Sequence, residues 1–223
     1  MQKIIETDFG KIEISIFGKR ELSNINFNSD NASLLISKRL SELLNTSESN
    51  IYGLKQVHGI DFFLAEDSPL VSTGDGLWTQ GKEKILYVKT ADCMPIFFWS
   101  TNKLLFGVLH SGWKGTRDGI TQKMINALKT QYPEIELNFY LGPCIRQNEY
   151  EIKEDVSIYF DNRSLKFIND KIYLGLENVI SFIIKENNFT LEDCNISTLS
   201  HPDYFSHRGK DIGRNLNVIR FLN

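Results

Sequence analysis

The apolar residues of this chain fall into short runs that are typical of β-strands. Alternating apolar and polar positions predict two strands at residues 3–7 and 11–17, joined by a turn at residues 8–10. Three further runs are apolar almost throughout, which predicts strands buried on both faces: residues 84–89, 95–99 and 104–109. The remaining strands are expected at residues 51–57, 61–65, 137–141, 195–199 and 218–222.

Three segments carry apolar residues at the spacing of an α-helix, namely residues 32–44, 116–132 and 177–187. These helices do not alternate strictly with the strands. A layered α+β sandwich with mixed sheets is therefore favoured over a doubly wound parallel sheet. No linker, internal repeat or low-complexity tract interrupts the pattern, so we expect a single domain over residues 1–223.

Composition narrows the class of protein. The 223 residues carry a formal net charge of −3, which argues against nucleic acid as the main partner, because such binding needs a basic surplus. The longest apolar runs have six residues and the first ten residues lack a hydrophobic signal region, so no membrane partner is expected. Three cysteines do not make a disulfide framework. These features predict a cytoplasmic enzyme.

Three potential metal ligands lie at the ends of predicted strands. His58 and His110 each follow an apolar run and precede glycine within two residues, and Cys93 lies between two apolar strands. If these strand ends converge, they provide a His₂Cys ligand set with an open fourth position, the form of a catalytic zinc site. Each residue alone also has an ordinary explanation, a hydrogen-bonded histidine or a cysteine that packs as a small hydrophobe.

Other polar residues are less specific. Asp75 lies between two glycines, where it is either a turn residue or a carboxylate held close to a ligand. Residues 204–215 combine aromatic residues and glycines with Arg208 and Arg214, which could bind an anion or form a solvated loop. Cys144 and Cys194 are more simply explained as packing residues.

The order of these motifs resembles a known family. The motifs are QVHG at residues 56–59, GDG at 74–76, TADCMP at 90–95, HSGWKG at 110–115, YE at 150–151 and YFSHR at 204–208. Together they are similar to the laccase-domain or polyphenol-oxidase-like family of the YfiH type, now viewed as purine nucleoside phosphorylases. The N-terminal glycine-rich run usual in that family is shortened here, and Lys114 stands where arginine is common.

The resemblance implies both a fold and a site. The fold would be the four-layer α/β/β/α sandwich with mixed sheets of the CNF1/YfiH-like group. The metal trio would be His58, Cys93 and His110, holding zinc. The activity would be phosphorolysis of adenosine, inosine, guanosine and S-methyl-5′-thioadenosine, with accompanying adenosine deaminase activity, so the expected partners are a purine nucleoside and phosphate.

From this resemblance we assign expected roles. Cys93 and His110 would be catalytic as well as metal ligands, and Asp92 would carry a proton or orient a ligand. The residues expected to contact substrate are Gln56, Asp75, Trp113 (stacking on the base), and Lys114, Arg208 and Arg214 (contacting phosphate).

Three alternatives remain open. A copper site that oxidises phenols is one, although four histidines are few for a multicopper enzyme. A cysteine hydrolase of the peptidoglycan-editing type is the second, with Cys93 as nucleophile and His110 or His58 as base. The third is a zinc-stabilised interaction domain without turnover.

Overall fold

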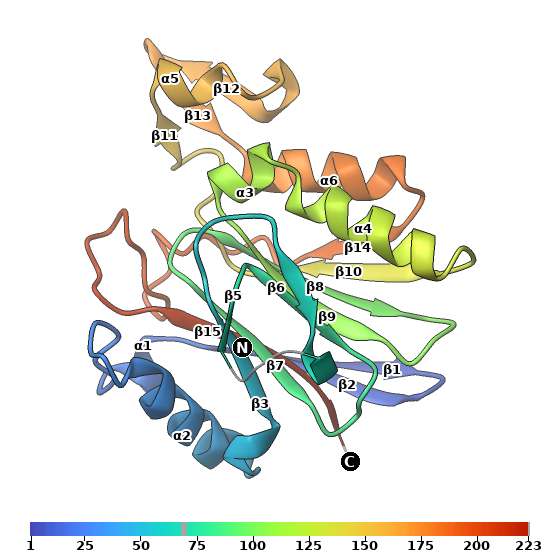
Figure 1. Ribbon diagram of the computed structural model, residues 1–223. Helices are drawn as coiled ribbons and strands as arrows, with labels where there is room; N and C mark the ends of the chain where they lie inside the picture. Colours follow the sequence, from blue (N-terminus) through green and yellow to red (C-terminus); the bar gives the residue numbers. More distant parts are fainter. Residues whose placement is uncertain (68–70, 223) are drawn as a thin grey trace.

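Two six-stranded sheets face each other between layers of helices in the computed structural model, which describes residues 1–67 and 71–222 (Figure 1). In the first sheet, neighbouring strands are antiparallel from the edge strand β1 as far as β7, and parallel from β7 to the other edge. Its strands, in spatial order, are β1 (Gln2–Thr7), β2 (Gly10–Phe17), β15 (Asn215–Leu222), β7 (Ile85–Thr90), β3 (Ile51–Lys55) and β5 (Val71–Thr73).

The second sheet is also mixed. Its four central strands are antiparallel, and the strand at each edge runs parallel to its neighbour. In spatial order it contains β14 (Thr190–Asp193), β10 (Leu137–Leu141), β8 (Met94–Ser100), β9 (Phe106–Ser111), β6 (Gly76–Thr79) and β4 (Phe62–Leu64).

Helices cover the outer face of each sheet. Helix α2 (Ala32–Leu44) lies against the first sheet, after the short α1 (Lys19–Leu22) (Figure 1). The second sheet is covered by α3 (Trp113–Arg117), α4 (Ile120–Gln131) and α6 (Leu176–Glu186). This arrangement confirms the predicted four-layer α/β/β/α sandwich. None of the helices among the described residues has the length and apolar character needed to cross a bilayer.

The alternation of side chains along β8 explains why the sheets stack. Every residue of β8 is buried. Ile96 and Phe98 pack toward the helices of the second sheet, whereas Phe97 and Trp99 pack between the two sheets. Successive side chains of a strand point to opposite faces, so a strand that is apolar throughout fits only between two packed layers. The prediction that this strand is buried on both faces is confirmed.

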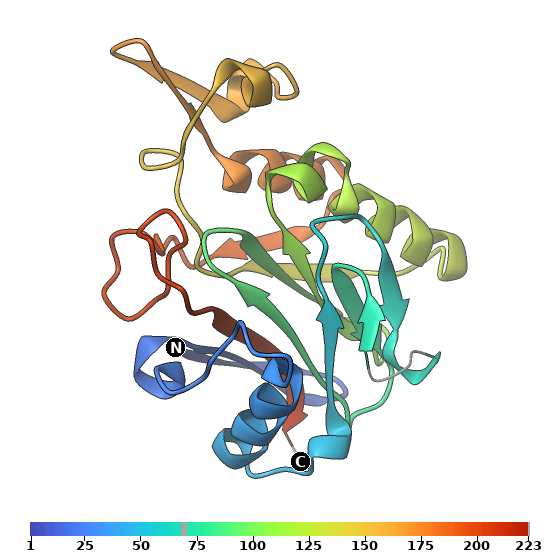
Figure 2. The same ribbon diagram turned by 60° about the vertical axis from the view of Figure 1, so that its left-hand side comes forward.

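A small three-stranded sheet projects from one end of the molecule, above the layer of helices (Figures 1 and 2). Its strand β12 begins at Leu165, which packs with Ile152 of β11 against the core beneath the helices. The elements of this projection are β11 (Glu151–Ile152), α5 (Glu154–Ser157), β12 (Leu165–Ile168) and β13 (Lys171–Leu174). Short 3₁₀ helices occur at Glu48–Asn50, Ala65–Asp67 and Asn162–Ser164.

Some expected elements differ in the structure. The helix predicted over residues 116–132 begins earlier, at Trp113, and is broken at Gly119, whose φ of +82° is left-handed and interrupts the helical ladder. Residues 195–199 form no named strand, and only a single bridge joins Ser197 to Cys144. The sequence pattern also missed β6, β14 and the projecting sheet, which are short or polar.

Candidate metal centre and cleft

Three potential ligands meet where the chain crosses from one large sheet to the other. His58 lies in the crossing between β3 and β4, Cys93 in the turn between β7 and β8, and His110 near the end of β9. One nitrogen or sulfur atom from each residue lies within 4.8 Å of the others. The two imidazole rings meet edge to face, with centroids 4.8 Å apart. The structure thus brings together the trio chosen from the sequence.

The carboxylate of Asp75 holds both histidines through hydrogen bonds. Its side chain is fully buried, and its carboxylate accepts a hydrogen bond from Nδ1 of His110 at 2.7 Å. The same carboxylate accepts the backbone amides of Val57, His58 and Gly59 at 3.3, 3.0 and 2.7 Å. Three consecutive amides around one anion hold His58 at its left-handed φ of +60°. Asp75 therefore fixes one histidine through its ring and the other through its backbone.

The charges in this cluster support one another. Burial opposes ionisation of Asp75, but the hydrogen bond from His110 and the amide of Gly59 lower the pKa of its carboxyl group. Burial likewise opposes ionisation of Cys93, but the charge of His110 and hydrogen bonds from both histidines lower its pKa to about 6. Burial disfavours the charged form of His110. The negative charges of Cys93 and Asp75 and their hydrogen bonds outweigh this effect and raise the pKa of His110 to about 9. A cysteine in this setting favours the thiolate, the form that binds metals.

The donor set fits a zinc ion. One thiolate and two imidazoles leave a fourth tetrahedral position open, and the carboxylate on His110 is the usual partner of a metal-bound histidine. Gly112 is required by the close packing here, because a Cβ at this position would lie 2.8 Å from Sγ of Cys93 and 3.1 Å from Cδ2 of His58. Copper also accepts two histidines and a cysteine, so the donor set does not establish the metal.

Asp92 ties the cysteine turn to a distant loop. It adopts a left-handed φ of +86°, and one carboxylate oxygen accepts the hydroxyl of Thr198 at 2.7 Å. The other oxygen accepts the backbone amide of Arg208 at 2.7 Å. Both oxygens are therefore engaged in holding the Cys93 turn against the loop that carries the arginines.

A cleft of about 600 Å³ opens over the trio. Its walls come from the segment before and within α2, the ends of β3 and β7, the start of α3, and the loop between β14 and β15. Besides the trio and Asp92, the lining residues are Phe27, Asn28, Ala32, Ile36, Gln56, Lys89, Thr90, Ala91, Trp113, Lys114, Tyr150, His207, Arg208 and Arg214. The volume is in the range of small-molecule sites.

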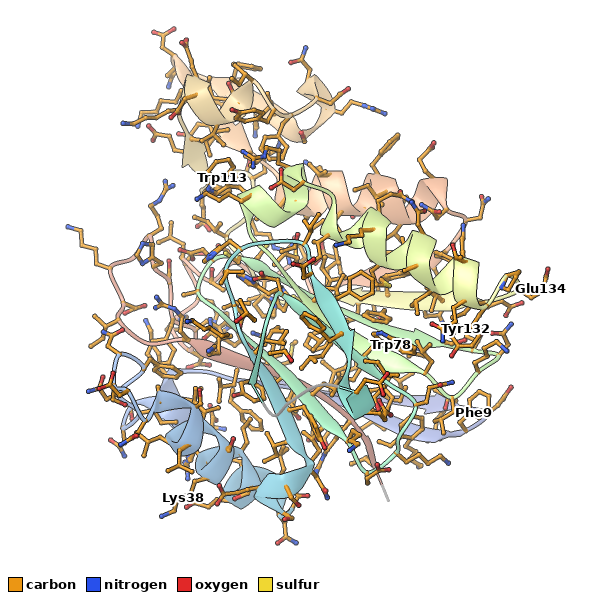
Figure 3. The ribbon with its side chains drawn as sticks, viewed as in Figure 1. Phe9, Lys38, Trp78, Trp113, Tyr132 and Glu134 are labelled. Carbon is orange, nitrogen blue, oxygen red and sulfur yellow. The ribbon has the colours of Figure 1, made fainter. Side chains whose placement is uncertain are left out.

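Several residues expected to contact substrate are already occupied. Both ends of the Gln56 side chain pair with the backbone of Lys89, at 2.8 Å each, and so extend the pairing of β3 with β7. Asp75 does not line the cleft. Trp113, labelled in Figure 3, lies at the start of α3 on the cleft wall, and the side chains of Lys114 and Arg117 lie over its ring.

The two expected arginines differ in their contacts. Arg208 donates from Nη2 to the backbone oxygen of Glu151 at 2.8 Å and lies over the ring of Tyr150, 5.4 Å from its centroid. Arg214 donates from Nη1 to the backbone oxygens of Ile212 and Gly213. Neither guanidinium is paired with a carboxylate among the residues that the structure describes.

Among the cleft residues to which the sequence gave no role, Tyr150 and Lys89 carry polar groups. Tyr150 belongs to a motif of the resemblance, and burial, with the nearby charge of Cys93, raises the pKa of its hydroxyl. Lys89 is a charged residue within an otherwise apolar strand. That contrast was the available signal for Lys89, because a lysine in a buried strand requires a specific environment.

Comparisons with known proteins agree with the fold and the motifs. A family model described as multi-copper polyphenol oxidoreductase laccase matches residues 21–222. The chain belongs to this laccase-domain, YfiH-type family. A Clostridium acetobutylicum protein named purine nucleoside phosphorylase is 34% identical over 178 residues, covering 74% of this chain and 75% of that protein.

Further relatives extend this likeness. A Rickettsia conorii protein, also named purine nucleoside phosphorylase, is 30% identical over 168 residues, covering 74% of this chain and 65% of its own length. Among solved structures, a Neisseria meningitidis protein superposes with a TM-score of 0.82 at 20% identity, covering 100% of this chain and 99% of that one. Bacillus licheniformis YfiH gives a TM-score of 0.79 at 20% identity, covering 89% and 85%. At this identity the structures establish the fold.

Proposed function

We propose that the protein is a zinc-dependent purine nucleoside phosphorylase that also deaminates adenosine. The observation that carries the proposal is a cleft in which a His₂Cys donor set lies beside cationic side chains. Among the residues that the structure describes, these cations have no carboxylate partner. The names of the relatives in Clostridium acetobutylicum and Rickettsia conorii support the same reaction. The substrates would be adenosine, inosine, guanosine and S-methyl-5′-thioadenosine, with phosphate as the second substrate.

His58, Cys93 and His110 would hold the zinc ion. When bound, zinc supplies a Lewis acid and lowers the pKa of a bound water toward neutrality. Asp75 keeps the ring of His110 in one orientation by accepting a hydrogen bond from its Nδ1–H. The other ring nitrogen is then available to the metal. Asp92 acts as a positioning residue, because both of its oxygens join the Cys93 turn to the Arg208 loop.

Phosphorolysis forms a bond from a phosphate oxygen to the ribose C1′ and breaks the bond from C1′ to the purine, which leaves with a proton. The chain must therefore bind an anion, hold the base and exclude water. Arg208, Arg214 and Lys114 are the cations expected from the sequence that line the cleft. Trp113 and Phe27 offer aromatic surfaces for a purine ring.

The test is an incubation of the purified protein with adenosine and phosphate, with bound metals quantified. The proposal expects adenine from adenosine, and inosine and then hypoxanthine from the deaminated fraction. Ribose 1-phosphate should equal the sum of adenine and hypoxanthine. It also expects about one zinc per chain, since the described residues contain one such ligand cluster. Free ribose formed without phosphate, or phenol oxidation by a copper-loaded protein with no phosphorolysis, would contradict the proposal.

One observation favours a second candidate, a cysteine hydrolase. Cys93, His110 and Asp75 have the arrangement of a nucleophile, a base and an orienting carboxylate. If Cys93 is instead a metal ligand, iodoacetamide should modify it slowly in the zinc-bound protein and quickly after chelation. Fast modification at unchanged zinc content would favour the hydrolase. Cys194, half-buried and outside the cleft, is the internal comparison, since its reactivity should not respond to the chelator.

The cellular location is also proposed. All three cysteines are free thiols. This state, together with the proposed thiolate ligand, suits a reducing compartment such as the cytoplasm.

A further inference from the structure

Lys89 is a half-buried lysine in a buried strand, and no described residue of opposite charge pairs with it. It is the fifth residue of β7, half-buried between the buried residues Val88 and Thr90, and it lines the cleft. Its backbone is paired with Gln56. Among the described residues, its ammonium group has neither a hydrogen-bond acceptor nor a carboxylate within ion-pair distance. A half-buried cation in this state is costly unless something else satisfies it.

Arg214 brings a second unbalanced positive charge to the same cleft. Within residues 1–67 and 71–222, its guanidinium donates only to the backbone oxygens of Ile212 and Gly213. Both bonds come from Nη1, so its other donors have no partner in this part of the chain. Burial and the neighbouring charge of Arg214 both lower the pKa of Lys89, which places the two cations within electrostatic reach. Folding has therefore brought like charges together at one wall of the cleft.

Other partly buried arginines of the chain are treated differently. Arg146 pairs with Asp193 at 2.7 Å, and Arg220 pairs with Glu13 at 2.7 Å. Among the described residues that line the cleft, Asp92 alone carries a carboxylate, which accepts hydrogen bonds from Thr198 and from a backbone amide. These lining residues therefore include no other acidic group that could balance Lys89 and Arg214.

We propose that Lys89 and Arg214 form the oxyanion subsite of the cleft, which binds inorganic phosphate as the second substrate. Naming phosphate as the ligand rests on the proposed function; the anion chemistry rests on the two unpaired cations. A dianion offsets both charges and accepts the free guanidinium and ammonium donors. Arg208 then has a different task, since its guanidinium is held over Tyr150 and against the Glu151 backbone.

The position of Lys89 suits this role. Lys89 lies four positions before Cys93, and four steps along an extended chain span at most about 14 Å. The anion subsite and the metal ligands are therefore close enough to act on one bound nucleoside. The pairing of Gln56 with the Lys89 backbone keeps the lysine in register at the end of the strand.

The test measures binding of inorganic phosphate alone to the metal-loaded protein by calorimetry. Lys89→Met keeps the length of the side chain and removes its charge, and Lys89→Arg keeps the charge. Lys38→Met is the matched control, because Lys38 is an exposed lysine on α2, outside the cleft (Figure 3). We expect Lys89→Met to weaken phosphate binding by about tenfold or more, the loss typical of a hydrogen bond to a charged group. Lys89→Arg should restore most of it, and Lys38→Met should bind like the wild type.

Nucleoside turnover is measured separately, so that the two proposals can fail independently. Unchanged phosphate binding in Lys89→Met overturns the subsite, even if nucleosides are still phosphorolysed. Loss of phosphate binding in a protein that consumes no nucleoside supports the subsite and contradicts the proposed function. A wild-type protein that binds no phosphate overturns the subsite. If Lys89→Met does not fold, Arg214→Met, in a loop, must show the same loss of phosphate binding for the proposal to stand.

Discussion

The two ends of the cleft are built in opposite ways. At the metal end, each ligand is held by buried partners: Asp75 fixes His58 and His110, and Asp92 anchors the turn of Cys93. At the cation end, Lys89 and Arg214 have no carboxylate partner among the described residues. The first end is geometrically complete before any ligand arrives, whereas the second is electrostatically incomplete. A metal site depends on fixed geometry, and an anion site depends on available charge.

The metal end also contains the unusual backbone. His58 and Asp92 both have positive φ values, of +60° and +86°, and each is, or immediately precedes, a proposed ligand. Such conformations cost on the order of 1 kcal/mol or more for residues other than glycine. They persist here because carboxylates satisfy the surrounding donors. This comparison predicts that changes at the metal end disturb the site as a unit, while changes at the cation end act on anion binding alone.

The largest effect is expected for the thiolate ligand. Cys93→Ser should reduce zinc affinity by more than about a hundredfold, because even the loss of a partner of a metal ligand costs 10–100-fold. Phosphorolysis should fall with it. The measurement is zinc per chain after dialysis against a chelator. Cys194→Ser should keep its zinc, since Cys194 lies outside the cleft. Full retention of zinc by Cys93→Ser would show that the three residues do not form one site.

A smaller loss is expected when the organiser of the histidines is changed. Asp75→Asn keeps the shape of the side chain. The single oxygen of the amide, however, cannot accept all four hydrogen bonds, three from backbone amides and one from the His110 ring. Zinc affinity should fall by roughly 10–100-fold, as measured by competition with a chromophoric chelator. Asp61→Asn is the control, because the Asp61 side chain is exposed and Lys123 is its one ion-pair partner among the described residues. Equal zinc affinity in both variants would mean that the Asp75 network is not needed to hold the ligands.

At the cation end, substitution of the two arginines should have different effects on the KM for phosphate. Arg214→Met should raise the KM for phosphate by about tenfold or more, because its free donors are lost. Arg208→Met should raise this KM less, since its guanidinium already contacts Tyr150 and the Glu151 backbone. Deamination requires no phosphate and should change little in Arg214→Met. Steady-state kinetics at varied phosphate provide the measurement, and a larger effect of Arg208→Met on the phosphate KM would reverse the assignment.

The sequence was most informative where one local pattern determines the outcome. Strand β8 is apolar at every position but its last, so burial on both faces was predictable from its letters alone. Strand β14 reads TLED and was missed, because its polar residues give no strand signal and its pairing with β10 creates the strand. The break at Gly119 was missed because a single glycine is also compatible with an unbroken helix.

The site was predictable in its ligands but not in their support. His58 and His110 stand out as strand-end residues with a glycine nearby, and Cys93 stands out as a cysteine between two apolar strands. Their convergence, however, depends on strands from both sheets. The role of Asp75 below the cleft could not be read from a GDG motif that also suits a turn. The balance of charges around Lys89 depends on which carboxylates reach the cleft, and that is a property of the folded chain.

The smallest effect is expected for Lys114, an exposed lysine on the cleft wall. Its ammonium group lies over the Trp113 ring, 5.7 Å from the centroid, and forms no ion pair among the described residues. An exposed charge interacts weakly with an anion and is screened by salt. Lys114→Met should therefore raise the phosphate KM by about two- to fivefold at low ionic strength, and by less at 0.5 M salt, roughly where the screening length falls below 5 Å.

The salt dependence separates this residue from the subsite. The effect of Lys89→Met should persist at high salt, because a half-buried contact is screened much less than an exposed one. Lys114→Met and Lys89→Met are therefore compared in the same salt series, with phosphate KM as the readout. If the loss in Lys114→Met were as large as that in Lys89→Met and equally resistant to salt, phosphate would bind at the rim of the cleft near α3. The division between a fixed metal end and a half-buried cation end that binds the anion would then be wrong.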